Sequence, residues 1–553
     1  MHNLHLYKAL SRLSLNSQES VHTGGALSEY DSYLHVPRPI EDKLAAKMQA
    51  IEQAGGGIVL LVGSAGDGKS HLISHIKQHF EWPDECYYND ATASSSPKRS
   101  AIQTLRTALQ EFSDAKLANT TKKLVLAINL GKLNAFIDDE ENKGVYNALI
   151  QAASPIFDDD DHTPAHESER IKVVLFPDEQ VFEFFPDRDD SYPVDSAFLT
   201  ALLDKVVQQT DKNPFYRAYQ QDKRVKANTQ MPLMINFQLL SIPEIRHCII
   251  MMVIEAIISC RLSITAREFL DFVYSILVYR QPDYSEKKAY YDALLPNLMF
   301  CGGDNLIQRA IALLDPLRHN SKEHNQQLAV LFTSETIPAN YIDTSTLPRE
   351  LIDRTNAFYA NGRDDRERTT KFLFRLQHLM EYHSEKDAYI SYISKLRGVM
   401  KNNALVLAEL DEQVKKAIPR YYGSYTQKAD LVPINVQGGR YKLFAPLEFE
   451  LSDILGRFPR TEEGDFSLRF TMIWKAGNAQ VPLRMDYQLY SFIFELNAGR
   501  LCSSRETEKN MEFGAFIRNL AKQCDCSKRL IILSQQSQKT YLKKTKFGTI
   551  QLR

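Results

Sequence analysis

The residues with the clearest potential for chemistry form one short run, Gly63-Ser-Ala-Gly66-Asp-Gly68-Lys69-Ser70, which fits the pattern G-x-x-x-x-G-K-[ST]. Its three glycines let the backbone approach a phosphate group closely and direct N–H groups at the oxygens. Lys69 supplies a positive charge for the β- and γ-phosphates, and the Ser70 hydroxyl is suited to ligate Mg²⁺. The run therefore predicts a nucleotide-binding loop.

The segments on either side of this run are those that such a loop requires. Residues 58–62 are apolar and predict a buried strand, and residues 71–80 predict a helix. The N-terminus of that helix adds a partial positive charge beside the phosphates. Further apolar runs at 86–89, 123–128 and 172–176, separated by helical patterns, predict a mostly parallel α/β sheet.

Hydrolysis of a nucleotide also needs a carboxylate near the metal and a group that orients water. The strand at 123–128 ends in Asn129, where a sensor of the γ-phosphate is expected, and not in an acid. Acids follow two other strands, Asp90 in one case and Asp178 with Glu179 in the other. We assign metal binding to Asp178 and water activation to Glu179, and a solvated acid in a loop is the alternative for each.

Two further positions could take part in a site. Thr265 predicts the start of a helix whose first turn presents Arg267, a candidate sensor of the nucleotide state, with a surface arginine as the alternative. His71 and His75 lie one helical turn apart, but no third metal ligand follows at a suitable spacing. The sequence therefore favours their being residues on one face of the helix. The nucleotide-contacting residues expected in full are Gly63, Ser64, Ala65, Gly66, Asp67, Gly68, Lys69, Ser70, His71, Asp90 and Arg267, with Ser70 and Asp178 as Mg²⁺ ligands.

Length and composition predict several globular domains, because 553 residues with 44% hydrophobic and 25% charged side chains exceed one ordinary core. We expect a lead at 1–40, a nucleotide-binding α/β domain at 41–230, a helical region at 231–416 and a β-rich domain at 417–553. Long helices are expected at 243–259, 265–279, 291–316 and 366–401. Alternating segments that predict strands in the last domain are RYKLFAP, FSLRFTMIW and YQLYSFIFEL.

Cysteine usage and charge bear on location and partners. The seven cysteines are scattered and odd in number, which favours a reducing cytoplasm. The most apolar run, 248–260, contains Glu255 and is shorter than the ~20 residues that cross a bilayer, so we expect no membrane role. Residues 516–553 contain nine basic residues and one acidic residue, Asp525. This basic tail is compatible with a phosphate backbone or an acidic partner, and a solvated tail is the alternative.

Several stretches carry a resemblance to a known family: residues 62–70, 88–94, 127–136, 294–300 and 314–318. In these the chain resembles the DptF family of DNA phosphorothioation-dependent restriction proteins. The resemblance implies a cytoplasmic P-loop ATPase of AAA-like type in a bacterial defence system, with a helical lid, ATP and Mg²⁺ as cofactors, and DptG and DptH as partners. It also implies action on double-stranded DNA that lacks phosphorothioate sulfur. Residues 89–92 and 128–131 would then line the same nucleotide site as Gly63, Gly66, Gly68, Lys69 and Ser70.

Three functions follow from this combination of motif and resemblance. The first is an ATP-binding and ATP-hydrolysing subunit of the restriction complex, with no nuclease centre of its own. The second is a nucleotide-binding scaffold that assembles partner proteins with little turnover. The third is a signalling NTPase without DNA contact. Whether the chain forms homo- or hetero-oligomers is left open.

Overall fold

The computed structural model describes residues 3–15, 29–63, 67–89, 101–157, 166–176, 181–188, 192–279, 287–319, 321–339, 341–423, 431–434, 441–456, 468–503, 510–524, 530–534, 539–544 and 550–552. Contacts divide the chain into two units. The first comprises Met1–Glu183, Asp195–Ile257 and Arg261–Glu385, and the second Phe184–Val194, Ile258–Cys260 and Lys386–Arg553. The finer division at residues 40, 230 and 416 stays a prediction.

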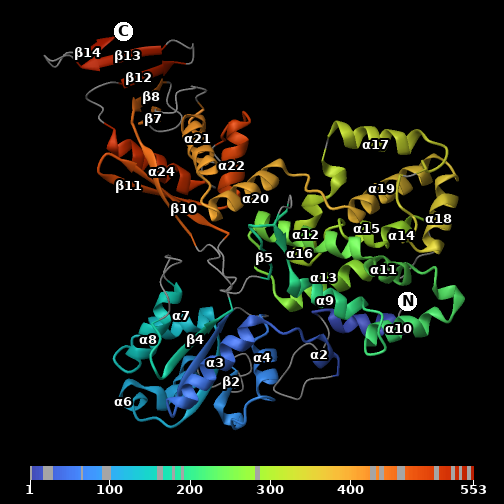
Figure 1. The fold of residues 1–553 in the computed structure, drawn as a ribbon, viewed down its shortest axis with the longest axis horizontal. Coiled ribbons are helices and arrows are strands. Elements are labelled where there is room, and N and C mark those ends of the chain that lie inside the picture. Colours follow the sequence, from blue (N-terminus) through green and yellow to red (C-terminus); the bar gives the residue numbers. More distant parts are fainter. Residues whose placement is uncertain are drawn as a thin grey trace. The chain divides into compact units, whose positions relative to one another are not determined.

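A four-stranded parallel sheet organises the N-terminal part of the first unit (Figure 1). Its strands are β1 (Gly57–Gly63), β2 (Tyr87–Asn89), β3 (Lys123–Asn129) and β4 (Ile171–Leu175), in the order β2-β3-β1-β4. Strand β1 pairs with β3 on one side and with β4 on the other, and all seven of its residues are buried. The prediction of an α/β fold with a parallel sheet is therefore confirmed.

Helices cover both faces of this sheet, because the side chains of β1 point alternately to opposite sides. Ile58, Leu60 and Val62 join a core with α5 (Ala101–Leu109), α7 (Leu130–Asp138) and α8 (Asn147–Ala153). Val59 and Leu61 join a second core with α3 (Pro39–Gln53) and α4 (Lys69–Ile76). Segments that precede and follow β1 in the sequence thus meet on one face.

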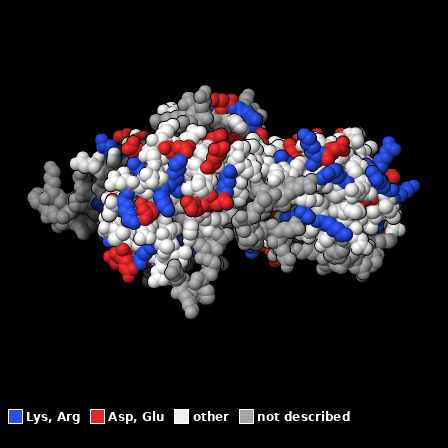
Figure 2. All heavy atoms as spheres, turned by 90° about the horizontal axis from the view of Figure 1, so that it is seen from below, with Lys and Arg blue, Asp and Glu red and all other residues white. Residues whose placement is uncertain are grey.

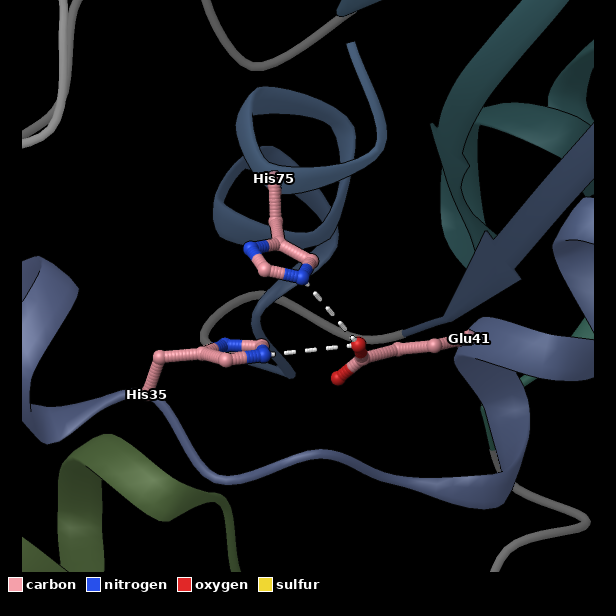
Figure 3. Close-up of side chains that lie close together, drawn as sticks. All are labelled: His35, Glu41 and His75. Carbon is pink, nitrogen blue, oxygen red and sulfur yellow. Dashed lines mark ion pairs between the residues drawn. The ribbon is translucent and has the colours of Figure 1, made fainter. Parts of the chain in front are cut away.

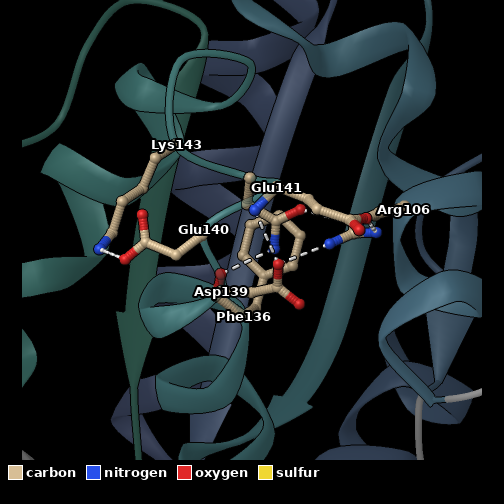
Figure 4. Close-up of polar contacts among 7 residues, drawn as sticks. Arg106, Phe136, Asp139, Glu140, Glu141 and Lys143 are labelled. Carbon is tan, nitrogen blue, oxygen red and sulfur yellow. Dashed lines mark hydrogen bonds and ion pairs between the residues drawn. The ribbon is translucent and has the colours of Figure 1, made fainter.

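A polar cluster fixes the turn that follows α7 (Figure 4). Arg106 on α5 donates through Nε to Asn142 Oδ1 at 2.7 Å and through Nη2 to Asp139 Oδ1 at 2.7 Å, and it also bonds to Glu141. Asn142 is fully buried and donates to the carbonyl of Phe136 at 2.8 Å. Because α7 begins directly after β3, this cluster anchors the far end of the helix that leaves the carboxyl edge of the sheet.

The remainder of the first unit is helical. Its other helices are α1 (His5–Leu10), α2 (Glu29–Leu34), α6 (Asp114–Leu117), α9 (Ala197–Val207), α10 (Pro214–Lys223), α11 (Pro232–Leu240), α13 (Ala266–Leu277), α14 (Lys287–Asp292), α15 (Leu295–Leu298), α16 (Leu306–Ile311), α17 (Lys322–Thr333), α18 (Arg349–Tyr359) and α19 (Arg363–Met380), together with most of α12 (Pro243–Cys260). Buried Asn236 joins three of these segments: it donates to the carbonyls of Leu277 and Ala293 at 3.0 and 2.8 Å and accepts from the Leu295 amide at 2.7 Å. These bonds satisfy backbone groups that the core would otherwise leave unpaired.

The second unit combines helices with two antiparallel sheets. Its elements are α20 (Asp387–Met400), α21 (Ala404–Tyr421), β7 (Leu431–Pro433), β8 (Tyr441–Pro446), β9 (Glu450–Leu455), β10 (Phe470–Ala476), β11 (Ala479–Met485), α22 (Tyr487–Asn497), α24 (Met511–Gln523), β12 (Leu530–Ser534), β13 (Lys539–Lys544) and β14 (Ile550–Leu552). One sheet has the order β11-β10-β9 and the other β14-β13-β12-β8-β7, while β5 (Glu183–Phe184) and β6 (Val194–Asp195) pair separately. The basic C-terminal segment therefore contributes strands, with Lys539, Lys543 and Lys544 on β13.

Two predicted elements of the helical region are confirmed, and two are wrong. The helices at 243–259 and 265–279 are present as α12 and α13. The stretch 291–316 is broken into short helices. Pro296 lies in the first turn of α15, and Gly302, which follows that helix, has a left-handed φ of 72°. The stretch 366–401 forms two helices, α19 and α20, and not one.

One predicted strand is a helix. RYKLFAP and FSLRFTMIW contain β8 and β10, but YQLYSFIFEL forms α22. The Asp486 carboxylate accepts from the amide of Leu489 at 2.9 Å, which caps the first turn. Leu489, Ile493 and Leu496 are then buried at helical spacing. The alternation of aromatic and polar residues predicted a strand here. The capped first turn and the helical spacing of the buried residues favour a helix instead.

Candidate functional site

The predicted nucleotide-binding loop joins β1 to α4. Gly63 ends the strand, Asp67 and Gly68 precede the helix, and Lys69 is its first residue. Gly68 has φ of 97°, a left-handed conformation that favours glycine. A Cβ on Gly63 would lie 2.4 Å from Asp67 Oδ2 and 2.9 Å from Phe176 Cβ, so a side chain there would collide with its neighbours. Ser64, Ala65 and Gly66 lie outside the described residues.

Lys69 and Ser70 begin α4 in contact with the sheet. Lys69 is only 7% exposed, and burial lowers the pKa of its ammonium group, while the charge of Asp67 acts in the opposite direction. The Ser70 hydroxyl accepts a hydrogen bond of 2.6 Å from the side-chain amide, Nδ2, of Asn89, the last residue of β2. Asn89 is the first residue of one of the stretches that the family resemblance assigns to this site, and the structure brings this residue to the loop.

Parallel pairing determines which strand ends lie beside the loop. Asn129 is the register partner of Gly63, so the end of β3 adjoins the start of the loop. On the other side, the Phe176 amide donates to the Val62 carbonyl at 2.9 Å, which carries the end of β4 to the same edge. The chain order turns from one side of β1 to the other here, and open α/β sheets bind ligands at such a position. Asp90, Asp178 and Glu179 lie outside the described residues, so their assigned roles stay predictions.

Arg267 lies in the first turn of α13, as predicted. Thr265 accepts from the Glu268 amide at 3.2 Å, and the Thr265 amide donates back to Glu268 Oε2 at 2.9 Å, which forms a reciprocal cap. The Arg267 guanidinium donates to the carbonyl of Leu15 at 3.4 Å. This contact joins α13 to the N-terminal segment, and the role of Arg267 in nucleotide sensing stays a prediction.

A cluster of histidines beside α4 is the feature that the sequence did not predict (Figure 3). His35 Nε2 lies 3.4 Å from Glu41 Oε2, and His75 Nε2 lies 3.7 Å from the same oxygen. The rings of His35 and His75 stack with centroids 3.8 Å apart. His71 joins the cluster through its Nε2, 3.0 Å from His35 Nδ1.

Burial disfavours the charged form of two imidazoles in this cluster. Desolvation, with smaller contributions from the neighbouring histidines, lowers the pKa of His35 to about 4, and desolvation also lowers the pKa of His75. The sequence contained two signals of this site: His71 with His75, one helical turn apart, and the pair His35 and Glu41, which lie six residues apart. They could not be used, because only the packing of α3 beside α4 brings His35 and Glu41 to His75.

On the face drawn in Figure 2, basic and acidic side chains are interspersed. In the part of the chain that the structure describes, no helix has the length and apolar character needed to traverse a bilayer. The mixed charge on the face drawn in Figure 2 does not test contact with DNA, which stays a prediction.

The structure is that of a mixed α/β protein. At the carboxyl edge of its parallel sheet, a glycine-rich loop, the buried Lys69 and the ends of β3 and β4 lie together. Comparison with known proteins adds no assignment: no protein-family model matches the chain, and no curated protein or solved structure does either.

Proposed function

We propose that this chain is a P-loop nucleotide-binding protein that holds ATP with Mg²⁺ at the β1–α4 loop. The observation that carries the proposal is the position of Gly68 and Lys69, the one left-handed and the other buried at the first turn of a helix that follows a buried parallel strand. Backbone amides at a helix N-terminus favour an anion, and the positive charge of Lys69 at the first position of the helix favours one further. A bound triphosphate would raise the pKa of Lys69 again.

Residues around the loop are suited to the metal and the terminal phosphate. Ser70 would ligate Mg²⁺, and Asn89, which already bonds to its hydroxyl, would orient it. Asn129, beside Gly63, would contact the γ-phosphate. Mg²⁺ would neutralise charge on the phosphates, and Asp178 and Glu179, which follow β4 in the sequence, are the acids proposed for the metal and the attacking water.

The wider role rests on the family resemblance. In it the chain is an AAA-like ATPase subunit of a phosphorothioation-dependent restriction complex with DptG and DptH, with residues 231–416 supplying a helical lid. The complex would act in the cytoplasm on unmodified DNA.

Lys69→Ala tests nucleotide binding directly. Loss of a charge-assisted bond of about 1.5–3 kcal/mol should weaken the affinity for a fluorescent ATP analogue roughly 10- to 100-fold. The matched control is Lys77→Ala, because Lys77 follows the same helix and pairs with exposed Asp84 at 3.0 Å. Equal affinities in the two variants would refute the proposal.

A scaffold with little turnover is the second candidate, and it is favoured by one observation: the strand next to β1 ends in Asn129 and not in a carboxylate. Phosphate release from ATP, measured with partners and DNA present, separates the two. Tight binding without release supports the scaffold, whereas release that Glu179→Gln abolishes supports the ATPase.

A further inference from the structure

We propose that His35, Glu41 and His75 together bind one divalent transition-metal ion, and that Zn²⁺ fits this donor set best. The three candidate ligand atoms all lie within 4.8 Å of one another. Two imidazole nitrogens with one carboxylate oxygen suit Zn²⁺, whereas Mg²⁺ and Ca²⁺ prefer oxygen ligands throughout.

The spacing of the ligand atoms matches tetrahedral coordination. With metal–ligand bonds of about 2.0–2.2 Å, two ligands of a tetrahedral site lie roughly 3.3–3.6 Å apart. The measured separations from Glu41 Oε2 are 3.4 Å to His35 Nε2 and 3.7 Å to His75 Nε2. These two separations are therefore close to those between the ligands of a tetrahedral site.

Outer partners hold two of the three ligands in place. His35 Nδ1 lies 3.0 Å from His71 Nε2, so His71 can accept the Nδ1 proton and leave the lone pair of His35 on Nε2, the atom nearest Glu41. The second oxygen of Glu41, Oε1, accepts from the Arg38 amide at 3.1 Å. Ligating histidines and carboxylates in metalloproteins are supported in this way. Among the described residues, the buried His35 Nε2 makes no hydrogen bond, which leaves it available to a metal.

Binding requires one rearrangement. The rings of His35 and His75 are stacked, with an interplanar angle of 23°, and a metal lies in the plane of each ring that ligates it. Rotation about χ2 must therefore open the stack. The side chains of His35 and His75 are 13% and 25% exposed, so His75 is the ring with more access to solvent.

The site would join two segments that the sequence keeps apart. His35 and Glu41 flank the start of α3, and His75 lies on α4, the helix that begins with Lys69. Arg38, between the two N-terminal ligands, donates to the carbonyl of Asp67 at 3.3 Å. A metal here would fix the segment that reaches the β1–α4 loop, with the fourth coordination position left for water.

Zn²⁺ titration of the purified full-length chain against a chromophoric chelator tests the site. We expect one tight equivalent in the wild type. Glu41→Gln and His75→Ala should each weaken binding by more than the roughly 10- to 100-fold that loss of an outer partner costs. Glu41→Gln keeps the fold, because the glutamine carbonyl can still accept from the Arg38 amide.

Two controls make the result decisive. His247→Ala removes an exposed histidine on α12 and should leave the affinity unchanged. Co²⁺ should give weak visible bands without the intense near-ultraviolet absorption of a thiolate ligand, which separates this site from the cysteines. Wild-type affinity in both Glu41→Gln and His75→Ala, or thiolate absorption that accounts for the bound metal, would overturn the proposal.

Discussion

Two glutamates of this chain, Glu41 and Glu385, each have a carboxylate oxygen near the nitrogens of two histidines, yet their surroundings differ. Glu385 Oε1 is 3.1 Å from His324 Nε2 and 4.0 Å from His378 Nδ1. Among the described residues, only the Glu41 group brings three candidate ligand atoms within 4.8 Å of one another. The Glu385 group is packed against Phe300 and Phe374 in the helical region.

The comparison teaches that residue types alone do not define a site. Burial lowers the pKa of His378 to about 4, as it does for His35, so both groups hold a neutral imidazole at neutral pH. At Glu41 three candidate ligand atoms converge, which favours a metal. The second histidine near Glu385, His378, is nearly fully buried, which favours a structural role for that group.

The largest effect on stability should come from the buried ion pair beside His378. Asp315, which faces His378, is paired with Arg375 through bonds of 3.1 and 2.6 Å and is almost fully buried. Arg375→Met leaves this charge unpaired, so we expect the free energy of unfolding to fall by about 3–5 kcal/mol, measured in urea. Arg368→Met, on the same helix but in an exposed pair with Asp365, should cost at most about 1 kcal/mol. Similar losses in both variants would contradict the prediction.

Acid should destabilise the folded chain through both groups. Between pH 6.5 and 4 the unfolded chain protonates at the position of His378 while the folded chain does not, so stability falls as the pH falls. With a folded pKa of about 4, the loss due to His378 should reach about 3 kcal/mol. Urea titrations across this range should show a shallower fall in His378→Gln than in the wild type.

His35→Gln provides the comparison, because burial lowers the pKa of His35 to about 4 as well. Since the change in stability follows from the difference between the folded and unfolded pKa, we expect this variant to flatten the pH dependence of stability about as much as His378→Gln does. Flattening in only one of the two variants would contradict this expectation.

Zinc should produce the smallest and most selective difference. At a free Zn²⁺ concentration of 100 times Kd, binding to the folded chain should add about 2.7 kcal/mol, seen as a higher melting temperature. Glu385→Gln should retain this gain, whereas Glu41→Gln should lose it. Equal loss in both variants would place the metal elsewhere.

Local signals predicted much of the fold. The strands β1, β3 and β4 and the helices α12 and α13 lie where apolar runs and periodicity place them. The errors at 291–316 and in α22 arose where a local turn or cap competed with an apparent period. Pro296, Gly302 and Asp486 determine these ends, and their effect depends on which neighbouring residues are buried.

By itself, the sequence determined the loop between β1 and α4, because strand, glycines, lysine and helix N-terminus are consecutive and each needs only its neighbours. Only the tertiary structure decided that Asn89 bonds to Ser70 and that His35 and Glu41 meet His75. These contacts join segments separated by tens of residues. They exist because α3 and α4 bury their apolar faces against the same side of the sheet, and no local pattern encodes which polar side chains that packing brings together.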